Sequence, residues 1–348
     1  MPRMGRSSTW EILAKKKAGQ GRSWPRRLGC LALLLLVGAP MLLGLVAEVY
    51  FRHVPYAIHQ DDALPPQQGP TDRGLWIRYL GVSGYEISDG TTTILIDPVA
   101  TRPRASELLF PLASDPLLEE AWCPKADFIL INHPHHDHSL DTPAIARRTG
   151  AEVYGSTSTC NLAQSRGVDA AKTHPIAPGD ELSLGGFTVT VGEAKHVPIF
   201  GMDPPFAGEV SPDAGALWFC QFGLDLTFSF HIRAADGTQV WFHPTILFES
   251  GSLKEKQADL LIYGINGVPL ERERTHAILA ESGASWVIPT HYDNFTQPLN
   301  AGLALFPGVD MDAFRSQVRS YNESADAPVR WSVLDYGQRL YLPPPADE

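Results

Sequence analysis

Short apolar runs that end at turn residues follow one another along the chain from Leu75 onwards. The stretch LWIRYLGVSGYEISDGTTTILIDP, residues 75–98, predicts two or three strands with a hairpin turn at Asp89-Gly90. ADFILIN, residues 126–132, is a continuous apolar run, which is typical of a strand buried on both faces. Hairpins are predicted over 179–196 and 226–242, and buried strands over ADLLIYGI and ASWVIPTH.

Helical patterns alternate irregularly with these strands. TPAIARRTG, residues 142–150, predicts a helix with Asp141 as its N-cap and Gly150 as its stop. Further helices are predicted over 270–283, ended by Gly283, and over 311–324. The order shows neither strict strand–helix alternation nor a repeat, so two sheets packed face to face with helices outside are expected. No linker interrupts the chain after residue 74, which predicts one domain over 75–348.

The N-terminal part of the chain has a different composition. Leu28 to Ala47 is an uncharged run of the length that spans a bilayer, and six lysines and arginines between Lys15 and Arg27 precede it. We therefore expect a cytoplasmic basic tail over 1–27, a transmembrane signal anchor over 28–50 and a linker over 51–74. The positive flank predicts a cytoplasmic N-terminus and an extracytoplasmic domain, with a cleaved signal peptide as the alternative.

Charge and cysteine content exclude two other classes of protein. The net charge is −11, with 39 acids against 28 bases, which argues against nucleic acid as a partner. Four cysteines are too few for a disulfide scaffold. Cys123 and Cys160 could pair in an oxidising compartment, whereas Cys220 is expected to be buried in an apolar stretch.

The stretch INHPHHDHSLD, residues 131–141, carries the candidate chemistry. Histidine nitrogen and carboxylate oxygen are ligands that zinc prefers. On an extended turn His133 and His135 would point to one side, and Asp137 and His138 would serve a second position nearby. His136 is expected to point outward and to bind no metal. Neither position is complete, because a catalytic zinc site has about three protein ligands, so remote histidines at strand ends are needed: His196 and His291.

These segments resemble those of the metallo-β-lactamase fold superfamily, in its lactonase-like and N-acyl phosphatidylethanolamine phospholipase D-like branch. HPHHDH is similar to the HxHxDH signature, and GEAKHVP and VIPTHYDNF resemble the downstream histidine segments. The resemblance covers residues 75 to about 300 and implies an α/β, αββα four-layer sandwich with a dinuclear metal centre. It assigns His133, His135 and His196 to one metal and Asp137, His138 and His291 to the other. It implies that Asp97 supports the metal-binding histidines without binding a metal itself.

One position departs from the family pattern. A bridging aspartate usually stands between the last two histidine segments, where this chain reads QVWFHPTILF. Pro244 aligns with it without a gap, and His243 aligns with a shift of one residue. Either His243 is a ligand, with Glu249 as a further substitute, or the bridge is absent and the second metal is weak or lost.

The expected chemistry is hydrolysis by a metal-bound hydroxide, since zinc lowers the pKa of a bound water to about 7. Two zinc ions are expected, with manganese as an alternative metal, and Asp137 is the candidate catalytic residue that orients the nucleophile and moves a proton. Phosphodiester or phospholipid-like substrates are expected, because a membrane anchor and an aromatic loop after His196 favour lipids. A lactonase or other ester hydrolase, and a non-catalytic metal-binding protein, are the alternatives. The sequence specifies neither the natural substrate nor the oligomeric state.

Overall fold

The computed structural model describes residues 38–345, except 66, 70–72, 200 and 252–256. The chain divides into two compact units, Met1–Ala47 and Glu48–Glu348. Of the predicted anchor over 28–50, residues 28–37 lie outside the described residues, and α3 covers Ala39–Tyr50. Among the helices that can be described, none combines the length and the apolar character that a bilayer span requires.

The second unit contains two mixed sheets. The first has the strand order β14-β1-β2-β3-β4-β5-β6 and the second β13-β12-β11-β10-β9-β8-β7. The strands of the first sheet are β1 Leu75–Gly81, β2 Gly84–Ser88, β3 Thr93–Ile96, β4 Phe128–Leu130, β5 Glu152–Gly155, β6 Thr173–Pro175 and β14 Arg339–Leu342. Those of the second are β7 Glu181–Leu184, β8 Phe187–Glu193, β9 Phe228–Ala234, β10 Gln239–His243, β11 Leu260–Gly264, β12 Trp286–Thr290 and β13 Arg330–Trp331.

The alternation of side chains along the strands produces the layers. In β3, Ile94 and Ile96 join the core between the two sheets, whereas Leu95 joins a separate core beneath the helices. Leu130 in β4 faces the inner core, while Ile129 faces the outer one. Both faces of the first sheet are therefore buried, which explains the continuous apolar runs of its central strands.

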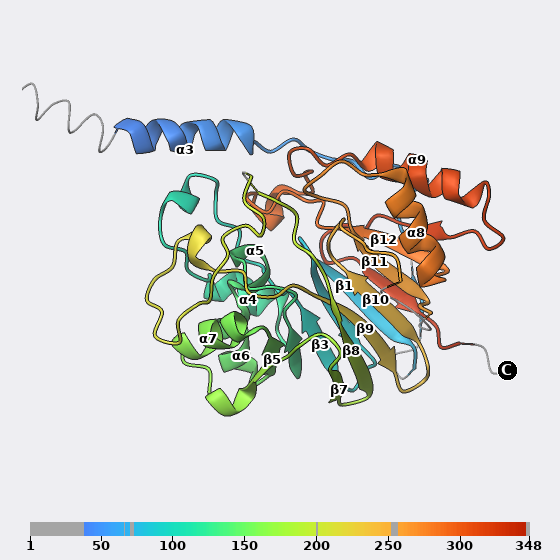
Figure 1. Ribbon diagram of the computed structural model, residues 1–348, viewed down its shortest axis with the longest axis horizontal. Coiled ribbons are helices and arrows are strands. Elements are labelled where there is room, and N and C mark those ends of the chain that lie inside the picture. The colour runs from blue at the N-terminus through green and yellow to red at the C-terminus, as the bar shows by residue number, and fades with distance from the viewer. Residues whose placement is uncertain (1–37, 66, 70–72, 200, 252–256, 346–348) are drawn as a thin grey trace, which may run out of the picture. The chain divides into compact units, whose positions relative to one another are not determined.

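Helices cover the outer face of each sheet (Figure 1). The helices beside the first sheet are α4 Pro116–Trp122, α6 Thr142–Thr149 and α7 Thr157–Ser165, and those beside the second are α8 Arg272–Ser282 and α9 Met311–Asn322. The described unit also contains the short helix α5 His136–Ser139 and four 3-10 turns: η2 Glu107–Leu109, η3 Ala170–Lys172, η4 Phe219–Gln221 and η5 Leu299–Ala301. The arrangement is the two-sheet α/β sandwich expected from the sequence.

Several local expectations need correction. Asp141 stands at the start of α6, but its side chain does not cap the helix; Oδ2 instead accepts hydrogen bonds from the amides of Ala100 and Thr101, both at 2.7 Å. The cysteines at 123 and 160 are free and buried, not paired, and Cys220 is exposed, not buried.

Part of the segment predicted as a linker, 51–74, packs against this unit. Asp62 is fully buried and forms an ion pair with Arg315, and its carbonyl accepts a hydrogen bond from Val333. The folded unit therefore begins before Leu75, because the buried side chains of Asp62 and Leu64 fix this segment to the core.

The fold brings several strand ends to one place. Strands β3 and β4 are parallel neighbours in the first sheet, and β11 and β12 are parallel neighbours in the second. The carboxyl ends of parallel neighbours lie at the same edge of a sheet, which is where α/β proteins usually bind ligands. Asp97 and His133 follow β3 and β4 within a few residues, and His291 follows β12 directly.

Candidate metal centre

The first group of candidate ligands consists of His133, His135 and His196, whose ligand atoms lie within 4.8 Å of one another. His133 Nε2 is 3.2 Å from His135 Nδ1. The other nitrogen of His133, Nδ1, lies against the side-chain oxygen of Asn132, and His196 Nδ1 lies 2.6 Å from the Val197 carbonyl. Because Nδ1–H donates to an oxygen in both contacts, Nε2 of each ring carries no proton and can bind a cation.

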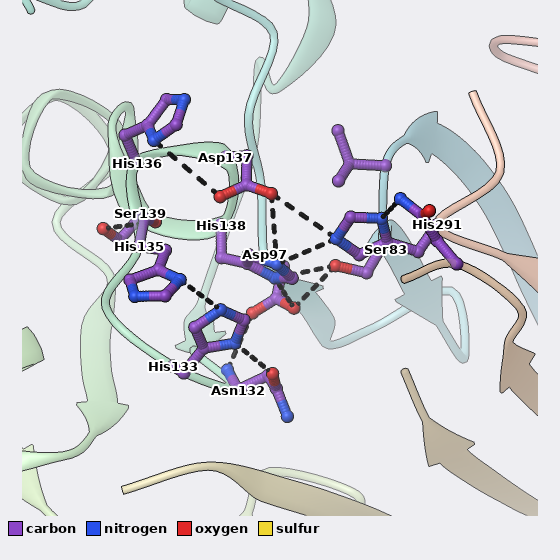
Figure 2. Close-up of polar contacts among 12 residues, drawn as sticks. Ser83, Asp97, Asn132, His133, His135, His136, Asp137, His138, Ser139 and His291 are labelled. Atoms are coloured by element: carbon purple, nitrogen blue, oxygen red, sulfur yellow. Dashed lines mark hydrogen bonds and ion pairs between the residues drawn. The ribbon is translucent and has the colours of Figure 1, made fainter. Parts of the chain in front are cut away.

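The second group consists of Asp137, His138 and His291 (Figure 2). Asp137 Oδ2 is 3.5 Å from His138 Nε2 and 3.4 Å from His291 Nε2, and the two Nε2 atoms are 3.3 Å apart. Asp137 and His138 come from the short helix α5, His136–Ser139, and not from an extended turn. The Ser139 hydroxyl, which donates to the Pro134 carbonyl over 2.6 Å, closes this helical turn.

The spacing of the donor atoms in the second group fits a zinc ion. Tetrahedral zinc with ligand distances of about 2.0–2.2 Å separates its ligands by about 3.3–3.6 Å, which matches the three distances between these atoms. All three atoms come from the residue types that zinc binds. The chemistry and geometry of both groups therefore suit metal ions, and a metal in each would use the six residues predicted from the sequence pattern.

Asp97 and Ser83 hold His138 in place. His138 Nδ1 lies 2.7 Å from Asp97 Oδ2 and 2.8 Å from Ser83 Oγ, and Ser83 also donates to Asp97 over 2.9 Å. The other oxygen of Asp97 accepts the amide of Asn132 at 2.7 Å. Asp97 thus orients a ring of the second group directly and fixes the start of the histidine segment through the backbone. A carboxylate behind a ligating histidine fixes both its tautomer and its orientation.

Electrostatics keep the three histidines of the first group and Asp137 in the forms that bind cations, whereas the pKa of His138 is raised, because Asp137 and Asp97 outweigh the effect of burial. Burial lowers the pKa of His135 to about 3 and that of His196 to about 4, and it lowers the pKa of His133 well below 6.5. Burial alone would raise the pKa of Asp137, but His138 and the other adjacent imidazoles outweigh it and hold that pKa well below its usual value. Neutral imidazoles and an ionised carboxylate are the ligand forms that metals require.

His243 lies in neither group. Its Nε2 is 3.1 Å from the Leu247 carbonyl, and its ring packs against Trp241, Phe248 and Tyr263. The preceding residue, Phe242, contacts Tyr85 of the first sheet. Because side chains alternate between the two faces of β10, His243 lies on the face that is turned away from the first sheet. The substitute Glu249 is exposed and pairs with Lys195. The structure therefore brings neither candidate bridging ligand to the centre, and Pro244 stands at the strand end.

His136 belongs to neither group, but it is buried and does not point outward as the sequence predicted. The rings of Phe219, Phe222 and Phe295 surround it at centroid distances of 6.0–6.2 Å. Its Nδ1 is 3.9 Å from Asp137 Oδ1. An aromatic enclosure thus adjoins the second group.

Sequence reasoning missed the supporting residues Ser83 and Asn132. Asn132 immediately precedes His133 at the end of an apolar strand, which is a signal that could have identified it. Ser83 lies in the turn between β1 and β2, 14 residues before Asp97, and no local pattern distinguishes it from other turn serines.

Strained backbone marks the same region. Val82, Asp97 and His291 have φ angles of 55°, 43° and 59°, which is a left-handed conformation that side chains other than glycine rarely adopt. The Val82 carbonyl accepts the amide of His291 at 2.6 Å, and the Val82 amide donates to Asp293 over 2.6 Å. These bonds hold the strained residues and join the two sheets beside the second group.

Comparison with known proteins agrees with the fold and the motif. The family described as "Beta-lactamase superfamily domain" matches residues 92–292, more than half of the chain. A "UPF0173 metal-dependent hydrolase" of Carboxydothermus hydrogenoformans is 35% identical over 129 residues, which are 37% of this chain and 50% of that protein. The chain thus spans about half the length of this relative.

Two further similarities extend over more of the chain. A "UPF0173 metal-dependent hydrolase" of Oenococcus oeni is 26% identical over 249 residues, which are 68% of this chain and 98% of that protein. Among solved structures, Igni18, a metallo hydrolase of Ignicoccus hospitalis, has a TM-score of 0.51 at 20% identity and covers 77% of this chain and 98% of its own. The last similarity concerns the fold alone.

Proposed function

We propose that this chain, which belongs to the β-lactamase superfamily, is a metal-dependent hydrolase that uses two zinc ions. The single observation that carries the proposal is the convergence of two three-residue groups from remote parts of the chain. His196 and His291 follow strands β8 and β12 of the second sheet, whereas the other four residues follow β4 of the first. Relatives named as metal-dependent hydrolases support the reaction class.

When bound, the zinc ions would lower the pKa of a water ligand to about 7 and polarise the scissile bond of the substrate. The chain's own residues have separate tasks. Asp137 faces His138 and His291 with Oδ2, while Oδ1 is directed towards His136. A carboxylate in this position can orient a nucleophile and accept its proton. Asp97 and Ser83 prevent the ring of His138 from rotating during that transfer.

The substrate is a phosphodiester, and a phospholipid-like molecule in particular, because the same protein carries an uncharged run over 28–47 behind a basic tail. This sequence supports a single-pass anchor over 28–50 with the N-terminus in the cytoplasm and the catalytic unit outside it. Nucleic acid is not the substrate, since a net charge of −11 opposes binding to a polyanion.

Metal analysis joined to a substrate panel tests the function. We expect two zinc ions per chain and hydrolysis of a bis-aryl phosphodiester or a phospholipid, and the double variant H133A/H135A should lose metal and activity. His174→Ala is the matched control, because His174 lies in the edge strand β6, pairs with Glu152, stacks on Tyr154 and belongs to neither group. A double variant that keeps full activity would refute the proposal, and turnover of lactones alone would assign the chain to the lactonase or ester hydrolase class.

A non-catalytic metal-binding protein is the second candidate, and Pro244 favours it. The family pattern has an aspartate at this strand end, and a proline side chain offers no donor atom. A wild-type protein with one bound zinc ion and no turnover on any ester or phosphodiester would establish this candidate in place of the first.

A further inference from the structure

Aromatic side chains connect the two candidate metal groups along one side. The Phe206 ring meets that of His135 at 5.8 Å between centroids and that of Phe219 at 5.5 Å. Phe219 in turn meets the buried His136 at 6.2 Å. Phe295 lies 6.0 Å from both His136 and His291. The rings thus form a continuous arc from the first group to the second.

Phe206 stands out in this arc because of its backbone. Its φ of 49° is in the left-handed region, which is unfavourable for a bulky side chain. Within the described residues, the non-glycine positions with positive φ are Val82, Asp97, Phe206 and His291. The other three lie at the metal centre or are bonded to it, so Phe206 shares a property that is otherwise confined to the site.

Main-chain bonds hold this conformation. The carbonyl of Phe206 accepts the Leu224 amide at 3.1 Å, and the Leu224 carbonyl accepts the Gly208 amide at 3.2 Å. Leu224 is buried, with 5% of its surface exposed. The loop that carries Phe206 is therefore fixed to the body of the unit, and the ring is presented from a rigid support.

The rings of the arc remain accessible. Phe206, Phe219 and Phe295 are each half-buried, unlike the fully buried aromatic residues of the core. Two cations near the centre are already engaged: Lys195 pairs with Glu249, and Arg102 pairs with Asp293. An uncharged part of a substrate would therefore meet apolar rings here, while the metal ions hold its scissile group.

We propose that Phe206, together with Phe219 and Phe295, forms an apolar wall that selects substrates with an aryl or acyl group next to the scissile bond. The inference rests on the proposed function, because the metal ions must hold the scissile group for the wall to act. A flat apolar group fits such a wall by edge-to-face contact with the rings. Small or strongly polar substituents would gain little from it.

Binding of two phosphonates to the zinc-loaded full chain tests the wall without turnover. Phenylphosphonate and methylphosphonate present the same anion to the metals and differ in the apolar group. We expect the wild type to bind phenylphosphonate about tenfold more tightly, and Phe206→Gly to bring the ratio of the two dissociation constants close to one. Glycine adopts positive φ without steric cost, so Phe206→Gly introduces no backbone strain that would lower the thermal midpoint of unfolding.

Phe219→Leu is a second variant that keeps an apolar side chain, and it should reduce the ratio partially. Phe110→Ala is the matched control, since it removes a phenyl ring that is 64% exposed and belongs to no ring pair of the arc. Equal binding of the two phosphonates by the wild type, or an unchanged ratio in Phe206→Gly, would overturn the wall alone. A chain that retains no zinc would overturn the proposed function and the wall with it.

Discussion

The ring of His138 and the carboxylate of Asp97 are joined over 2.7 Å, although 41 residues separate them in the chain. His138 is a candidate ligand, and Asp97 is fully buried behind it. The same carboxylate accepts the Asn132 amide, so one side chain positions both the ring and the strand end that leads to the ligand segment. This relationship predicts how the centre depends on a residue that touches no metal.

Replacement of Asp97 by alanine should weaken metal binding at the second group by about 10- to 100-fold, because His138 loses the acceptor that fixes its tautomer. Competition with a chromophoric chelator measures this directly. Asp127→Ala serves as the control: its carboxylate also accepts a backbone amide, that of Thr93, but it is 41% exposed and remote from the ligands. Equal metal affinity in the Asp97 variant and the wild type would contradict the assigned role.

The number of zinc ions bound per chain should show that His196 is a metal ligand and that His243 is not. His196→Ala removes a member of the first group and should leave about one zinc ion per chain, with the second group intact. His243→Gln should retain both ions, because His243 bonds to the Leu247 carbonyl and lies in neither group. Elemental analysis after dialysis gives both numbers. A loss of zinc in the His243 variant would restore that residue as a ligand.

The buried pair Arg102–Asp293 should be important for stability. The two charges lie 3.2 Å apart with side chains 1% and 0% exposed, and Asp293 also accepts hydrogen bonds from Tyr79 and Val82. Arg102→Ala leaves that carboxylate buried without its cation and should cost about 3–5 kcal/mol in the free energy of unfolding. Urea denaturation of the zinc-loaded protein measures the loss.

The exposed pair between Lys125 and Asp127 provides the comparison for this loss. Its side chains are 59% and 41% exposed, so Lys125→Ala should cost less than about 1 kcal/mol. If Arg102→Ala and Lys125→Ala lower the free energy of unfolding by similar amounts, the buried pair does not stabilise the turn at Val82.

The free energy of unfolding of the metal-free protein should fall as the pH decreases from 6.5 to about 4, because His243 is buried. Burial lowers the pKa of His243 to about 4, against 6.5 for the unfolded chain, so between these values the unfolded state binds the proton and the folded state does not. Stability therefore rises with pH in this window, by up to about 1.4 kcal/mol per pH unit for one such histidine. His133, His135 and His196 contribute with the same sign.

The variant His243→Gln measures how much His243 contributes to this pH dependence of stability. Unfolding measured in chelator at several pH values between 4 and 6.5 should show a slope lower by about one proton than that of the wild type. An identical slope would mean that the ring is solvated or protonated in the folded state.

The sequence predicted the two-sheet sandwich because apolar runs of strand length and helical periods are local properties. Gly150 and Gly283 end α6 and α8 in the left-handed conformation, as their positions after helical patterns indicated. The motif HPHHDH and two histidines at strand ends likewise identified the six residues that the structure gathers into two groups. The anchor over 28–50 stays a prediction.

Other features were decided only by tertiary structure. Whether His243 faces the centre depends on which side of β10 meets the first sheet, and Phe242 takes that side by contacting Tyr85. A local pattern gives the period of a strand but not the face that its partner sheet will cover. The support of His138 by Ser83 and the strained turn at Val82 arise from contacts between segments far apart in sequence. The residue types at this centre were thus readable from the chain, whereas their orientation was set by the packing of one sheet against the other, because packing and not sequence proximity determines which side chains meet.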